Sequence, residues 1–96
     1  MTFRMLQHPH PFYQQQPLRG PGHATIDGSV GDLVSLLPLT GDASGIRTMG
    51  LYYALKGETL SFGKPRGVSN VLNEELAEVS VENGIVRVIY KCGGAW

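Results

Sequence analysis

The stretch A-E-V-S-V-E-N-G-I-V-R-V-I-Y, residues 77–90, is the strongest indication of fold class in this sequence. Apolar residues at positions 77, 79 and 81 alternate with polar ones, and a second alternation follows at positions 86, 88 and 90. A period of two is typical of a half-buried β-strand. Asn83-Gly84 can supply both positive-φ residues of a type I′ turn, so we predict a β-hairpin here.

Further short strands are predicted upstream, where glycine-containing turns separate runs of apolar and β-branched residues. These strands are predicted at residues 23–27, 33–39, 46–49, 51–55 and 59–62. Pro38 must lie at a strand end or on an edge, because it cannot donate to a ladder. No segment from His23 onward has a sustained helical period. We therefore predict an all-β fold, an antiparallel β-sandwich of about seven short strands.

Most of the core is predicted to come from the apolar residues of these runs. They are Leu33, Leu36, Leu39, Ile46, Leu51, Leu55, Leu60, Phe62, Val79, Val81, Val86 and Val88.

The sandwich domain is predicted over residues 22–92, because residues 1–21 have a different composition. Pro9, Pro11 and Pro17 each remove a backbone donor, and Gln14–Gln16 adds a polar run. We predict a flexible, irregular N-terminal arm over residues 1–21, with at most a short strand at 2–6. The tail at 93–96, Gly-Gly-Ala-Trp, is predicted to be frayed.

Composition narrows the class of protein. The 96 residues suffice for one domain, and eight basic residues balance eight acidic ones. This balance argues against a general nucleic-acid or anionic-membrane surface. No apolar run approaches the ~20 residues of a membrane span. A lone cysteine, Cys92, excludes an intrachain disulfide and fits a reducing cytoplasm, and we expect it to be inert.

No catalytic or metal-ligating pattern is present. His8-Pro9-His10 lacks the Cys, Asp or Glu cluster that a zinc site needs, and Gly63-Lys64 lacks the glycine spacing of a P-loop. The carboxylates are scattered over turns and strand faces. We assign no catalytic residue and no metal site to this chain.

One loop is a candidate binding site. Residues 63–70, G-K-P-R-G-V-S-N, lie between two predicted strands, and Ser69 and Asn70 can donate to and accept from a polar heterocycle. Taken alone, such a loop is more often a plain surface turn. Tyr52 and Tyr53 should alternate across their strand, one inward and one outward. The outward ring could offer a π face to a flat or cationic ligand, or both tyrosines could be ordinary sheet residues.

Four ordered blocks resemble a known family. They are G-D-L-V-S-L-L-P-L-T (31–40), G-L-Y-Y-A-L (50–55), E-T-L-S-F-G (58–63) and R-G-V-S-N-V-L (66–72). Together with the closing V-S-V-E-N-G-I-V-R-V-I, they resemble the C-terminal domain of bacterial thiamine pyrophosphokinases over roughly residues 22–90.

The resemblance implies a β-sandwich that binds thiamine. The family transfers pyrophosphate from ATP to the hydroxyethyl group of thiamine with Mg²⁺, giving thiamine diphosphate and AMP. Thiamine lies in a cleft between an α/β catalytic domain and the sandwich, at a dimer interface. By resemblance, Ser69 and Asn70 would hold polar groups of thiamine, Tyr53 would pack near its rings, and Gly67 would belong to the same site.

Two departures from the family pattern qualify this expectation. Ala54 stands where bacterial relatives often have proline. The α/β domain that carries the ATP and Mg²⁺ residues has no counterpart here, and residues 1–21 are too short to replace it. We therefore expect a chain that is inactive alone, with thiamine, an α/β catalytic domain and a second copy as partners. The alternatives are a free-standing, non-catalytic binding sandwich and a dimerisation module.

Overall fold

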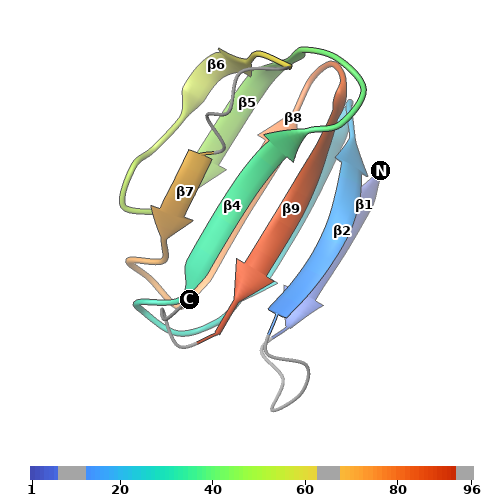
Figure 1. The fold of residues 1–96 in the computed structure, drawn as a ribbon. Helices are drawn as coiled ribbons and strands as arrows, with labels where there is room; N and C mark the ends of the chain where they lie inside the picture. The colour runs from blue at the N-terminus through green and yellow to red at the C-terminus, as the bar shows by residue number, and fades with distance from the viewer. Residues whose placement is uncertain (7–12, 63–67, 93–96) are drawn as a thin grey trace.

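The computed structural model describes residues 1–6, 13–62 and 68–92, which form two β-sheets packed face to face (Figure 1). The five-stranded sheet contains, in spatial order, β1 (Thr2–Leu6), β3 (Gly22–Asp27), β8 (Leu76–Val81), β5 (Ala43–Met49) and β6 (Lys56–Leu60). The four-stranded sheet contains, in spatial order, β2 (Tyr13–Arg19), β9 (Ile85–Lys91), β4 (Leu33–Pro38) and β7 (Val68–Val71). The predicted all-β sandwich is confirmed, with nine strands among the described residues rather than about seven.

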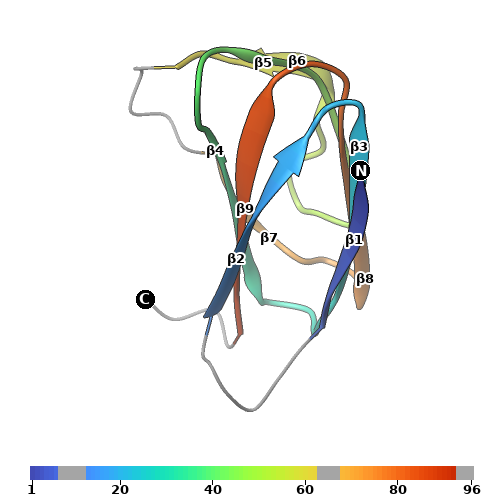
Figure 2. The same ribbon diagram turned by 90° about the vertical axis from the view of Figure 1, so that its right-hand side faces the viewer.

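Consecutive strands lie in opposite sheets, with the single exception of β5 and β6 (Figure 2). This crossing order explains the one parallel pair among the described strands. Because β2 reverses the chain direction in the other sheet, β3 returns beside β1 in the same direction, with Thr2 opposite His23. All other strand pairs in the described part of the chain are antiparallel.

The predicted hairpin at residues 77–90 is wrong. The alternating runs do form β8 and β9, but β8 lies in the five-stranded sheet and β9 in the four-stranded sheet. Gly84 has a φ of +94°, whereas no described non-glycine residue has positive φ, so Asn83 does not supply the first residue of a type I′ turn. Asn83 instead pairs with Ser44 of β5, and its N–H donates to the Ser44 carbonyl over 3.1 Å. The turn is therefore an arch between sheets.

The predicted irregular arm at residues 1–21 is also wrong for the residues that the structure describes there. The short strand expected at 2–6 is β1, and residues 13–19 form β2. β2 is an edge strand, which is where a strand tolerates a proline such as Pro17. Met5 and Leu18 are buried in the core and anchor these strands, so the sandwich begins with β1 rather than at residue 22.

The core lies between the two sheets and contains eight of the twelve predicted residues. These are Leu36, Ile46, Leu51, Leu60, Val79, Val81, Val86 and Val88. In β4 the buried residue next to Leu36 is Val34, because residues of one strand face alternate, and Leu33 is only half-buried. Leu39 and Leu55 are also half-buried, and Phe62 is exposed. The tail at 93–96 lies outside the described residues.

A buried polar contact closes one end of the sandwich. The Tyr90 hydroxyl donates to Asp32 Oδ2 over 2.6 Å, and the Ser29 N–H donates to the same oxygen over 2.9 Å. Burial, and then hydrogen bonding to Asp32 and Cys92, raises the pKa of the Tyr90 phenol far above its ordinary value. The contact fixes the crossing from β3 to β4 against β9, and the half-buried Cys92 belongs to the same cluster.

We predict that Gly28→Ala destabilises the fold through this contact. A Cβ at residue 28 would lie 2.4 Å from the Tyr90 hydroxyl oxygen and 2.8 Å from Asp32 Oδ2, so the buried pair must shift. Overpacking of this kind lowers the free energy of unfolding by about 1–3 kcal/mol. Gly41→Ala is the control, because a Cβ there meets no heavy atom within 4 Å. Urea unfolding of both variants checks this, and equal midpoints would show that the pair has room to move.

Candidate functional site

Residues 51–55 form a loop, so the strand predicted there is wrong. Gly50 turns the chain out of β5 with a φ of +77°, and a Cβ on it would lie 2.3 Å from the Leu76 carbonyl oxygen. Leu51 is buried and forms an isolated bridge with Leu72. β6 then begins at Lys56, in the gap between the strands predicted at 51–55 and 59–62. The loop thus reaches from the five-stranded sheet toward β7 of the four-stranded sheet.

Asn70 fixes this loop from the side of β7. Its side chain is 2% exposed. Asn70 Oδ1 accepts hydrogen bonds from the N–H groups of Tyr53, over 2.8 Å, and Val71, over 3.1 Å. Asn70 Nδ2 donates to the Tyr53 carbonyl over 2.5 Å, and the Tyr52 N–H donates to the Val71 carbonyl over 2.8 Å. Two of the predicted thiamine-binding residues, Tyr53 and Asn70, are therefore brought together, with the carboxamide turned toward backbone.

Thr48 fixes the other end of the loop from β5. Its side chain is buried, and Thr48 Oγ1 accepts a hydrogen bond from the Leu55 N–H over 2.8 Å. The Thr48 N–H donates to the Leu55 carbonyl over 2.9 Å. Sequence reasoning missed Thr48, because a threonine in a predicted strand is an ordinary sheet residue. A signal was available only in its spacing of seven residues from Leu55, which says little without the fold.

Both tyrosines of the loop point outward, which corrects the expectation that one would be buried. The exposed fractions are 68% for Tyr52 and 64% for Tyr53, because the loop does not alternate as a strand does. Their rings meet edge to face, with centroids 4.9 Å apart and planes at 80°. Such a pair offers two aromatic faces at nearly a right angle to a flat or cationic ligand.

The remaining residues of the predicted loop are only partly described. Ser69 precedes Asn70 in β7 and lies opposite Ser35 of β4 in the register of the sheet. Gly67, together with Lys64 and Arg66, lies outside the described residues. The position of the Ser69 backbone is therefore established beside Asn70, whereas the role of Ser69 and Gly67 stays a prediction.

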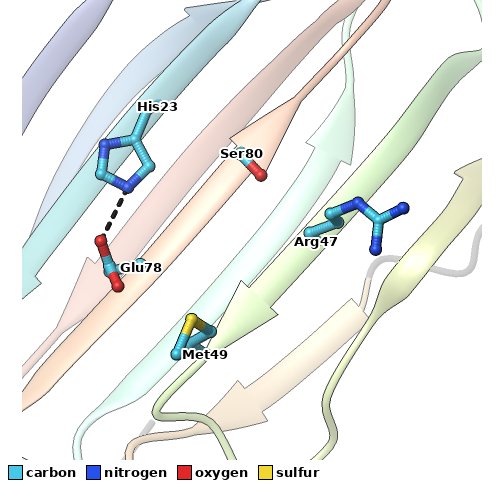
Figure 3. A pocket seen from close by; sticks show the side chains of 5 residues that line it. All are labelled: His23, Arg47, Met49, Glu78 and Ser80. Carbon is cyan, nitrogen blue, oxygen red and sulfur yellow. Dashed lines mark hydrogen bonds and ion pairs between the residues drawn. The ribbon is translucent and has the colours of Figure 1, made fainter.

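A second feature is a hollow on the outer face of the five-stranded sheet (Figure 3). It is lined by His23 of β3, Glu78 and Ser80 of β8, and Arg47 and Met49 of β5. His23 Nε2 lies 2.9 Å from Glu78 Oε1, and both side chains are about two-fifths exposed (41% and 39%). A pair this exposed is screened by solvent, and Arg47 points away from it. We assign no chemistry to this hollow.

The side chains that could ligate a metal ion are dispersed over the described residues. No group of three or more His, Cys, Asp or Glu side chains among residues 1–6, 13–62 and 68–92 could hold a metal ion. In the same residues no helix is long and apolar enough to cross a membrane. The remaining candidate site is the exposed pair Tyr52 and Tyr53, on a loop that the buried side chains of Thr48 and Asn70 hold in place.

Comparison with protein families identifies the chain. Residues 23–86 match the family described as "Thiamin pyrophosphokinase, vitamin B1 binding domain". The chain belongs to this family. The match includes the loop with Tyr52 and Tyr53, the Ser69-Asn70 pair of β7, and Thr48. No curated protein matches the sequence.

Solved structures of thiamine pyrophosphokinases share the fold. The enzyme from Geobacillus thermodenitrificans superposes with a TM-score of 0.75 at 21% identity, over 86% of this chain and 39% of that one. The Bacillus subtilis enzyme gives 0.73 at 22% identity, over 84% and 38%. A family protein from Enterococcus faecalis gives 0.65 at 18% identity, over 84% and 37%. This vitamin B1 binding domain thus spans less than two-fifths of the solved chains.

We predict that Asn70→Ala lowers the free energy of unfolding by about 1–3 kcal/mol. The substitution removes the hydrogen bonds to Tyr53 and Val71 and leaves backbone groups without their partner. Asn73→Ala is the matched control, because this exposed asparagine lies three residues further on, and surface changes stay within about 0.5 kcal/mol. Thermal and urea unfolding of both variants provides the measurement. Equal stability of the two variants would contradict a structural role for the Asn70 carboxamide.

Proposed function

We propose that this chain supplies the thiamine-contacting half of a thiamine pyrophosphokinase active site, with the ligand seated on the Tyr52–Tyr53 loop beside Ser69. The observation that carries the proposal is the meeting of Tyr53 and Asn70 through hydrogen bonds of 2.8 and 2.5 Å. The blocks at residues 50–55 and 66–72, which resemble the family separately, thereby lie side by side at Tyr53 and Asn70. Family membership supports thiamine as the ligand.

The chemistry of thiamine suits this surface. Thiamine has a flat aminopyrimidine ring and a cationic thiazolium ring, and an exposed tyrosine face attracts both by stacking and by cation–π interaction. The perpendicular rings of Tyr52 and Tyr53 could each contact one of the two. Ser69 has a hydroxyl that can donate and accept.

ATP and Mg²⁺ do not fit the described residues. Mg²⁺ with a nucleotide takes oxygen ligands from carboxylates that converge on one point, and no such group exists among these residues. Asp27 pairs with Arg4, Asp42 accepts from the Phe62 N–H, and Asp32 is buried against Tyr90. We derive no step through ATP or Mg²⁺ from this chain.

In the proposal, both groups belong to an α/β catalytic domain outside these 96 residues. The spans of 37–39% of the solved enzymes support this division of the site. The complete enzyme would be a cytoplasmic homodimer that forms thiamine diphosphate and AMP. A catalytic domain would then approach the tyrosine loop, so that the hydroxyethyl end of thiamine faces ATP.

We predict saturable thiamine binding that requires Tyr53. NMR titration of the full chain, up to about 10 mM thiamine because half a site binds weakly, should shift the ring resonances of Tyr52 and Tyr53. Tyr53→Ala should abolish the shifts. Phe62→Ala should retain them, because this exposed aromatic lies beyond the far end of β6. Ser69→Ala should weaken binding.

The outcomes separate the alternatives. Pyrophosphate transfer to thiamine by the purified chain with ATP and Mg²⁺ would contradict the placement of these groups in another domain. A chain that dimerises without any thiamine-dependent shift would contradict the binding proposal and favour a dimerisation module. Shifts that persist in Tyr53→Ala would move the thiamine site elsewhere.

A further inference from the structure

Buried polar side chains are scarce in this domain, and most of them serve one loop. Among the described residues, only Asp32, Thr48 and Asn70 are polar and buried, with exposed fractions of 2%, 5% and 2%. Asp32 holds Tyr90 and the crossing from β3 to β4. The other two both bond to the backbone of residues 51–55.

The two side chains that bond to this loop come from opposite sheets. Thr48 lies in β5 of the five-stranded sheet and binds Leu55, whereas Asn70 lies in β7 of the four-stranded sheet and binds Tyr53. The loop is therefore held at its middle and at its C-terminal end by side chains that neither sheet needs for its own ladder. A buried hydroxyl or carboxamide is stabilising only when it is paired, so both groups depend on the loop as much as the loop depends on them.

Asn70 has little capacity left for a ligand. Its Oδ1 already accepts two hydrogen bonds, which fills both lone pairs of a carbonyl oxygen. Its Nδ2 already donates to the Tyr53 carbonyl. The Asn70 side chain is buried, whereas Tyr52 and Tyr53 beside it are about two-thirds exposed to solvent. A ligand on this surface meets the rings before it can meet the carboxamide.

We infer that Thr48 and Asn70 are positioning residues that hold the Tyr52–Tyr53 pair in its binding geometry, and that neither contacts the ligand. The inference deepens the proposed function and rests on it for the identity of the ligand. It reassigns Asn70, which the resemblance implies as a group that holds thiamine directly, and it adds Thr48 to the site.

The physical reason is preorganisation. A loop that samples several orientations binds with an apparent affinity reduced by the fraction of molecules in the competent one. Backbone bonds at Tyr53 and Leu55 restrict these orientations before the ligand arrives. The backbone that carries the two rings then needs less ordering when the ligand binds.

Thr48 allows a test that leaves the ligand surface unchanged. Thr48→Val keeps the shape of the side chain but removes the acceptor for the Leu55 N–H, and Thr48→Ser keeps the hydroxyl. In Thr48→Val we expect the Tyr53 amide, which Thr48 does not touch, to lose at least about tenfold of its hydrogen-exchange protection. The ring-current shifts between Tyr52 and Tyr53 should shrink, and thiamine affinity should fall about three- to tenfold. Thr48→Ser should behave as the wild type.

A double-mutant cycle tests Asn70. If Asn70 acts only by orienting the pair of rings, Asn70→Ala weakens thiamine binding in the wild-type background and has a clearly smaller effect in the Tyr52→Ala background, where no pair remains to be oriented. An equal loss in both backgrounds would mean direct contact with thiamine and would overturn the inference. A Thr48→Val protein with unchanged Tyr53 exchange and ring shifts would overturn it as well, even if Asn70→Ala fails to fold.

The two proposals fail in different ways. If the wild-type chain shows no thiamine-dependent shift, the proposed function fails, and the exchange and ring-shift comparison of Thr48→Val with Thr48→Ser still decides whether these residues hold the loop. If the wild type binds thiamine but Thr48→Val binds equally well, the function stands and the positioning role is wrong.

Discussion

The chain leaves its sheet after every described strand, and the backbone outside the ladders is where the domain uses its buried polar side chains. Backbone that leaves one sheet for the other has no ladder partner, and buried backbone groups must be paired. In the crossing from β3 to β4, Asp32 supplies such a partner, because its carboxylate accepts hydrogen bonds from the Ser29 N–H and the Tyr90 hydroxyl. The buried polar side chains of the described residues therefore bond to the connections between strands rather than within the sheets.

The connection between β5 and β6 stays in one sheet, yet it also receives buried polar support. The connection leaves the sheet at Gly50 and returns at Lys56, so it is too long for a tight turn. Its middle residues bond to the end of β7 and to Leu72. Thr48 and Asn70 replace the ladder that a tight hairpin would have provided. A loop that is held this firmly and still exposes two aromatic rings supports the proposed binding surface.

Strand periodicity was sufficient to predict the fold class, and it failed where long-range pairing decides. Alternation at residues 77–81 and 86–90 identifies two strands correctly, because each buries one face. It cannot say whether they pair with each other, and Asn83-Gly84 suits an arch as well as a hairpin. The proline-rich segment at 13–19 lacks a strong pattern, since an edge strand needs few buried side chains beyond Leu18.

The residues of the candidate site were predictable only in part, because their contacts also depend on long-range pairing. The resemblance led to Tyr53 and Asn70, which the fold brings together although they are 17 residues apart. Their roles depend on which way the carboxamide points, and no pattern of residue types contains that direction. Thr48 could not be found at all, because its hydroxyl matters only through the path of the loop that follows it.

The most direct test of this account is the NMR behaviour of the Asn70 side-chain amide during a thiamine titration. If the carboxamide holds the loop, one Nδ2 proton is protected from exchange and close in space to Tyr53 before thiamine is added, and it stays so at saturation while the tyrosine rings shift. An Asn70 amide that exchanges freely without thiamine, and becomes protected with contacts to the ligand when thiamine binds, would contradict the central claim.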